Sequence, residues 1–244
     1  MNRTALLTAL LSCAAAPLRA DAIALELSRS PFCLLGETIR VSVARGMALV
    51  EGRYEFKYVP RFDGGPHSDR VAFEFPVFAP AGAESLTALI ETLQPKLRVG
   101  AAEFTPSGAD PWSEATGGSL PFVPESVRVA ILVFEVPRVL LRERCTLDLT
   151  YYQPTHRLAD KEVVAYLPLL PDFEALKNEL LFSRLDFTVE FEAVDRIRLH
   201  RLSANESVVR DTPEKVTVHP VHREIIALTI EAAAPAAEGP RARP

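Results

Sequence analysis

Cysteine, methionine and tryptophan are scarce in this chain, at three, two and one among 244 residues. Beyond the first residues, no apolar run approaches the eighteen residues that a membrane-spanning helix needs. There is no block of like charge, and the net charge is −5, which argues against nucleic acid and an anionic membrane surface as partners. Nucleophile-elbow, zinc-helix and phosphate-loop motifs are missing as well. We therefore predict no catalytic residue, no cofactor and no metal site.

Residues 1–22 have the layout of a signal peptide. Met1-Asn2-Arg3 is a short basic start, residues 4–17 are mostly apolar, and Ala20-Asp21-Ala22 supplies small residues for cleavage. Such a segment predicts export to the periplasm or the outside, with no integral membrane segment left after cleavage. An alternative is lipid anchoring at Cys13, because Leu10-Leu11-Ser12-Cys13 loosely resembles a bacterial lipobox.

Cleavage would leave two cysteines, Cys33 and Cys145. An even pair in an oxidising compartment favours a disulfide. The alternative is two separate buried thiols.

Alternation of apolar and polar residues dominates the remaining chain and predicts β-strands. The clearest segments are 53–59, 71–77, 126–136 and 145–152. Pro76 indicates an edge strand, because proline lacks a backbone donor. Segment 126–136 is apolar on both faces, which indicates a central strand.

Residues 185–199 predict a hairpin with a tight turn near Val194-Asp195. Its apolar side chains would face inward, with an acidic outer face on one strand opposite a basic outer face on the other. The acidic residues are Asp186, Glu190 and Glu192, and the basic ones are Arg196, Arg198 and His200.

Two helices are expected among the strands. Ser85 is a suitable N-cap for a helix with leucine and isoleucine at i, i+3, i+4 and i+7, ending before Pro95. A second helix is predicted over residues 172–181.

These elements predict a mainly β fold, with one or two packed antiparallel β-sandwich lobes and two short packing helices. We expect a signal peptide at 1–22, a β-rich lobe at 23–107, a linker or long loop at 108–120, a second β-rich lobe at 121–231 and a disordered tail at 232–244. Glycine, proline, serine and alanine mark the linker, and alanine and proline mark the tail.

Few residues are candidates for a binding or reactive site. Trp112, the sole tryptophan, lies in the linker, where it could stack on a sugar or a partner or fold back over the core. His156 is expected in a solvated turn. His219 and His222 would point to opposite faces of a strand, which disfavours a shared metal.

Strand alternation at Tyr54–Tyr58 and Phe73–Val77, together with residues 150–154 and 166–168, resembles exported bacterial β-sandwich proteins of unknown function. That resemblance implies the fold and export, and brings no established catalytic residues. Together with the absence of catalytic motifs, this resemblance leads us to expect a non-enzymatic exported protein that binds or supports a protein or glycan of the cell envelope. The alternative is a secreted hydrolase with a dispersed site on the loops around residues 63–69 and Trp112.

Overall fold

The computed structural model describes residues 31–59, 69–111, 122–169, 186–194, 196–203, 207–220 and 224–233. The predicted signal peptide, the helix expected over 172–181, and all but residues 232–233 of the predicted tail lie outside this part of the chain. The mainly β prediction is confirmed, because the described elements are strands apart from one α-helix and one 3-10 turn.

The largest described sheet has eight strands in the order β13-β14-β11-β1-β2-β8-β4-β5. Within the described residues, all of its strand pairs are antiparallel except β1 with β11, which run parallel. Its strands are β13 (Ser207–Thr212), β14 (Lys215–His219), β11 (Asp186–Ala193), β1 (Phe32–Ala44), β2 (Met47–Tyr58), β8 (Arg144–Pro154), β4 (Lys96–Val99) and β5 (Ala102–Phe104).

Two smaller antiparallel sheets complete the described fold. The three-stranded sheet has the order β3-β7-β6, with β3 (Arg70–Pro80), β7 (Val127–Pro137) and β6 (Gly108–Pro111). The four-stranded sheet has the order β12-β15-β10-β9, with β12 (Ile197–Arg201), β15 (Ile226–Ala232), β10 (Lys161–Tyr166) and β9 (His156–Leu158).

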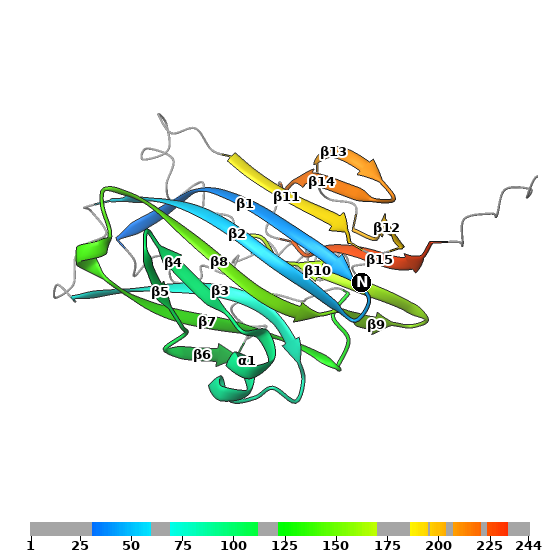
Figure 1. Cartoon of the computed structure of the whole chain (residues 1–244), viewed down its shortest axis with the longest axis horizontal. Helices are drawn as coiled ribbons and strands as arrows, with labels where there is room; N and C mark the ends of the chain where they lie inside the picture. The colour runs from blue at the N-terminus through cyan, green and yellow to red at the C-terminus, as the bar shows by residue number, and fades with distance from the viewer. Residues whose placement is uncertain are drawn as a thin grey trace, which may run out of the picture.

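One hydrophobic core joins the three sheets, which Figure 1 shows as layered ribbons. The large sheet contributes aromatic residues such as Tyr54 and Phe56, and the three-stranded sheet contributes Phe73 and Phe75. The rings of Phe56 and Phe73 meet edge to face with their centroids 5.0 Å apart, and the rings of Tyr54 and Phe75 are tilted by 59°. This is the packing expected of a β-sandwich, in which inward residues of facing sheets interdigitate.

The strand alternation read from the sequence is confirmed in all four segments. Val71, Phe73, Phe75 and Val77 are buried on β3, and β8 buries every second residue from Leu147. Strand β3, which carries Pro76, lies at the edge of its described sheet, and β7 lies in the middle.

Helix α1 (Leu86–Leu93) also matches its prediction. The Ser85 hydroxyl accepts a hydrogen bond from the Ala88 N–H at 3.1 Å, which caps the first turn. Gln94 then takes a left-handed conformation and donates its N–H to the Ile90 carbonyl, so that the helix ends before Pro95. With eight residues, this single described α-helix is far too short to cross a bilayer.

The predicted hairpin over 185–199 is wrong, although its inward-facing residues are right. Phe187, Val189 and Phe191 are buried on β11, but β11 lies between β1 and β14 of the large sheet. Strand β12 pairs with β15 in another sheet instead. The two strands on either side of this short connection therefore belong to different sheets.

The predicted linker does not separate two sheets. Residues 108–111 form β6 and pair with β7, while residues 112–120 lie outside the described part. Strands β2 and β8, from the two predicted lobes, pair over eleven residue positions from Met47↔Pro154 to Lys57↔Arg144. The described halves therefore share one sheet and one core.

Candidate functional site

A buried carboxylate, Glu37, lies inside the core at 1% exposure. The register of β1 against β2 shifts between Leu34 and Gly36, so that Glu37 is opposite the inward-facing Tyr54. A bulge of this kind adds one residue and re-aims the side chains that follow. Gly36 is also needed here, because a Cβ would lie 2.9 Å from the Asp186 carbonyl oxygen of β11.

Glu37 connects the large sheet to the four-stranded sheet. Its Oε1 accepts a short hydrogen bond from the Tyr166 hydroxyl, and its Oε2 accepts one from the Leu169 N–H at 2.8 Å. The hydroxyls of Tyr54 and Tyr166 lie 3.1 Å apart, so that they also share a hydrogen bond. We call Glu37, Tyr54 and Tyr166 the inter-sheet network.

The tyrosine hydroxyls of the inter-sheet network stay protonated. Burial first, and then the nearby Glu37 carboxylate, hold the pKa values of Tyr54, Tyr151 and Tyr166 well above the usual range. A neutral phenol can donate to the carboxylate, whereas a phenolate would repel it. Because Glu37, Tyr54 and Tyr166 are at most 2% exposed, the inter-sheet network ties two sheets together and does not face a substrate.

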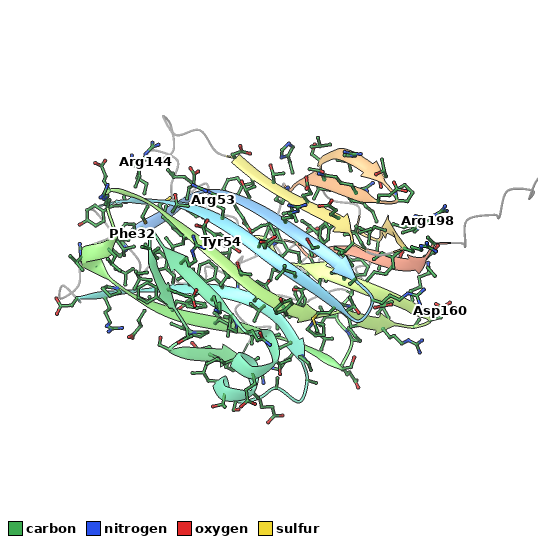
Figure 2. All side chains as sticks on the ribbon, viewed as in Figure 1. Phe32, Arg53, Tyr54, Arg144, Asp160 and Arg198 are labelled. Atoms are coloured by element: carbon green, nitrogen blue, oxygen red, sulfur yellow. The ribbon has the colours of Figure 1, made fainter. Side chains whose placement is uncertain are left out.

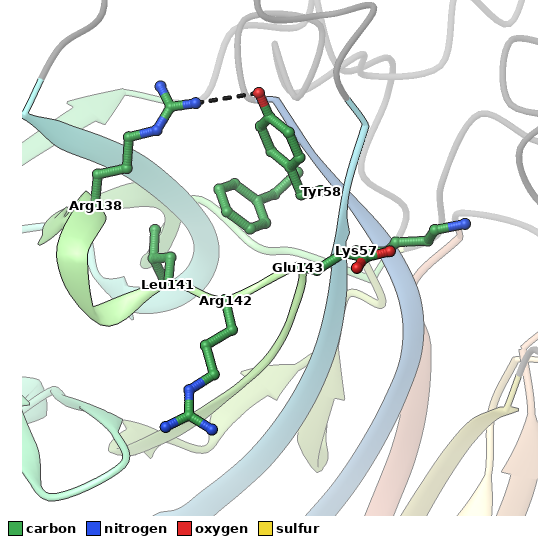
Figure 3. Close-up of a pocket in the computed structure, with 7 residues that line it drawn as sticks. Lys57, Tyr58, Arg138, Leu141, Arg142 and Glu143 are labelled. Carbon is green, nitrogen blue, oxygen red and sulfur yellow. Dashed lines mark hydrogen bonds between the residues drawn. The ribbon is translucent and has the colours of Figure 1, made fainter.

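The accessible candidate site is an open pocket of about 580 Å³ at the end of the sandwich. The chain crosses there from β7 to β8 through the 3-10 turn η2 (Arg138–Leu140). Figure 3 shows the residues that line it, which are Phe32, Lys57, Tyr58, Arg138, Leu141, Arg142 and Glu143.

Aromatic and cationic groups meet in this pocket. The Arg138 Nη2 donates to the Tyr58 hydroxyl at 3.2 Å, and its guanidinium carbon lies 5.5 Å from the centre of the Tyr58 ring. The Phe32 and Tyr58 rings are 5.5 Å apart and tilted by 57°. Arg142 points away from Arg138 (Figure 3), so that the two guanidinium groups lie on different sides of the turn.

Backbone contacts hold the turn beside the pocket in place. The Arg138 N–H donates to the Asp69 carbonyl at 2.8 Å, and the Leu141 N–H donates to the Arg138 carbonyl at 3.0 Å. The Tyr58 N–H donates to the Glu143 carbonyl at 2.8 Å. The pocket wall is therefore fixed to both β2 and the start of β3.

The predicted disulfide between Cys33 and Cys145 is wrong, because the two cysteines are not joined. Cys33 is opposite Lys57 and Cys145 is opposite Phe56, so that the two side chains leave the sheet on opposite faces. Strand β2 also separates β1 from β8, which places the two backbones about 10 Å apart, beyond the span of a disulfide. Burial raises the pKa of the Cys145 thiol to about 11, which makes it a poor nucleophile.

His156 is not the solvated turn residue that the sequence suggested. It is 6% exposed on β9, and its Nε2 lies 2.9 Å from the Phe122 carbonyl oxygen. Burial lowers its pKa, which the hydrogen bond to Phe122 partly opposes. The neutral His156 ring is therefore a buried packing residue that contacts the Phe122 backbone.

The remaining predicted site residues are not brought together. His219 lies 2.8 Å from the Phe187 carbonyl oxygen through Nδ1, and His222 lies outside the described residues. Within the described ranges, no three histidine, cysteine or acidic side chains are placed to hold a metal ion. Trp112 and residues 63–68 also lie outside these ranges, so that the dispersed hydrolase site stays a prediction.

The acidic face of β11 has different partners from those predicted. Glu192 accepts hydrogen bonds from Arg40 of β1, which lowers its pKa, and Glu190 pairs with Lys215 of β14 at 2.7 Å. His200 pairs with Glu231 at 3.5 Å on the other sheet. These charges follow the observed strand order and need no catalytic explanation.

Sequence reasoning missed both Glu37 and the pocket. One signal was available, since a glycine within an apolar strand pattern, as in Leu35-Gly36-Glu37, indicates a bulge. The pocket joins residues about 100 positions apart and leaves no local pattern.

No family model matches this chain, and no curated protein matches its sequence. Among solved structures, native leukotriene A4 hydrolase from Saccharomyces cerevisiae is similar with a TM-score of 0.42 and 13% identity, over 87% of this chain and 31% of the hydrolase. The yeast hydrolase in complex with bestatin is similar with a TM-score of 0.42 and 12% identity, over 84% and 30%. This chain thus spans about a third of the hydrolase's length, and no residue role is taken from it. The resemblance to exported bacterial β-sandwich proteins stays a prediction.

Proposed function

We propose that this chain is an exported, non-enzymatic β-sandwich protein that binds a protein or glycan of the cell envelope through the pocket at Tyr58 and Arg138. The pocket is the observation that carries the proposal. Its volume of about 580 Å³ lies within the range of ligand pockets, and its wall is fixed by backbone hydrogen bonds before any ligand arrives.

The chemistry of the lining favours binding over catalysis. A guanidinium group such as that of Arg138 only donates hydrogen bonds, so that it is suited to holding an anionic group and not to transferring protons. The half-buried Tyr58 adds an aromatic face suited to a sugar ring or an apolar side chain. We therefore expect the ligand to carry a carboxylate or phosphate next to an apolar or sugar surface.

Export is supported by the composition of residues 1–22, which combine a basic start, an apolar run and small residues before Ile23. The large shared core supports a stable unit that can serve as a rigid carrier for the pocket.

Native mass spectrometry tests both parts of the proposal. The full-length protein is expressed, released gently from the envelope fraction and weighed beside the variant Arg138→Gln/Arg142→Gln. Arg157→Gln is the matched control, because it makes the same change on β9, away from the pocket lining.

We expect a chain that begins at Ile23 and carries additional bound mass in the wild type and in Arg157→Gln. The double variant should lose that mass, because it removes both guanidinium groups from the pocket lining. A bare wild-type chain, or mass retained equally by all three proteins, would overturn binding through this pocket. A chain still carrying residues 1–22 would overturn export.

A further inference from the structure

We infer that the turn between β7 and β8 docks this protein onto an anionic lipid surface. The tip consists of Val139 and Leu140, and we call these two residues the apolar tip. Val139 is 89% exposed and Leu140 is 40% exposed. Figure 1 shows this turn as the green segment at the left end of the molecule, and Figure 2 labels Arg144, at the start of β8, at the same end.

Basic residues surround the apolar tip. The sequence from Arg138 to Arg144 holds three arginines and one glutamate, in a chain whose overall charge is negative. Lys57 of β2 lies directly opposite Arg144 of β8, so that two like charges share one face of the sheet. Like charges placed opposite each other are unfavourable in water alone and become favourable beside an anionic surface.

This local pattern differs from the average that the net charge describes. A net charge of −5 describes the average of the chain, whereas the field at a surface decays within about 8–10 Å at physiological salt. The stretch from Arg138 to Arg144, with three arginines and one glutamate, carries a formal charge of +2 on that scale. Apolar side chains flanked by arginines are the combination that peripheral proteins use to enter the headgroup region.

The turn is held ready for such a contact. Leu141 packs against the core, and the Arg138 N–H is anchored to Asp69. These contacts point Val139 outward without a folding step, so that little conformational entropy is lost on docking. The inference rests on the proposed function for one premise, that the protein reaches an envelope membrane.

Vesicle cosedimentation tests the inference with purified full-length protein. The probes are vesicles of phosphatidylcholine alone and vesicles in which about a third of the lipid is phosphatidylglycerol. The test variant is Val139→Ser/Leu140→Ser. The matched control is Val208→Ser/Val209→Ser, because these two valines form another adjacent exposed apolar pair, 39% and 58% exposed, on β13.

We expect wild type and control to bind the anionic vesicles at least tenfold better than the neutral ones, with binding that weakens as salt rises. The apolar-tip variant should lose at least tenfold in affinity while its melting temperature is unchanged, since both side chains are exposed.

A second readout locates the contact directly. Tryptophan is placed at Val139 or at Val209 in a Trp112→Phe background, where it is the only indole. Val139→Trp fluorescence should shift to the blue with anionic vesicles, and Val209→Trp fluorescence should not.

Equal binding to both vesicle types, or unchanged binding by the apolar-tip variant, would overturn the inference. If the native mass spectra show bound mass but the protein does not bind vesicles, the lipid-docking inference is refuted. The proposed function is then unaffected.

Discussion

Removing one hydroxyl from the inter-sheet network should destabilise the whole fold. Tyr166→Phe deletes the donor to the Glu37 carboxylate and the partner of the Tyr54 hydroxyl, all within the core. A hydrogen bond to a charged group contributes about 1.5–3 kcal/mol, and the cost rises when its partner stays buried. Glu37 keeps the Leu169 N–H at 2.8 Å, so that we expect a loss of about 1.5–3 kcal/mol.

For a domain of this size, 1 kcal/mol corresponds to about 2–4 °C in melting temperature, so that the expected decrease is about 3–12 °C. Circular dichroism during heating and urea titration would give both quantities. Tyr152→Phe is the matched control, because Tyr152 lies on β8 and is 37% exposed. If Tyr166→Phe stays within about 0.5 kcal/mol of this control, the network does not stabilise the fold.

Three further predictions follow from the core. Since the pKa values of three buried tyrosines are raised, unfolding lets them ionise, and stability should fall as pH rises above about 10; phenolate absorbance at 295 nm should then rise together with loss of ellipticity, and full phenolate absorbance with the ellipticity retained would contradict this. Reductant should leave the melting temperature unchanged, because no disulfide joins Cys33 and Cys145; a decrease would indicate a disulfide after all. Gly52→Ala should cost about 1–3 kcal/mol in urea unfolding, since its Cβ would lie 2.6 Å from the Tyr54 ring, whereas Gly82→Ala, with open space around it, should not.

Strand identity was predictable from the sequence, but strand pairing was not. The period of two shows which residues share a face, and the faces of β2, β3 and β8 were predicted correctly on that basis. Periodicity carries no information about the neighbouring strand. The segment 185–199 was therefore interpreted as a hairpin, whereas its two strands belong to different sheets.

The two site-level errors have the same physical origin. Cys33 and Cys145 each belong to a correctly recognised strand, and only the intervening β2 and the opposite faces exclude a bridge. Glu37 is buried because one register shift changes the face of every residue after it. The helix at α1 was predictable in full, since its cap and apolar stripe are local.

The parallel pairing of β1 with β11 also affects the order of assembly. Gly36 pairs with Asp186, so that one flank of β1 stays open until about 150 further residues have emerged. Contacts this distant in sequence require a large loop to close before they stabilise anything, which slows folding. Meanwhile β1 and β2 present an unsatisfied row of amides and carbonyls to any neighbouring chain. A holdase that covers the β1 flank early should therefore raise the yield of folded protein, and mutations that weaken β11 should favour aggregation over simple loss of stability.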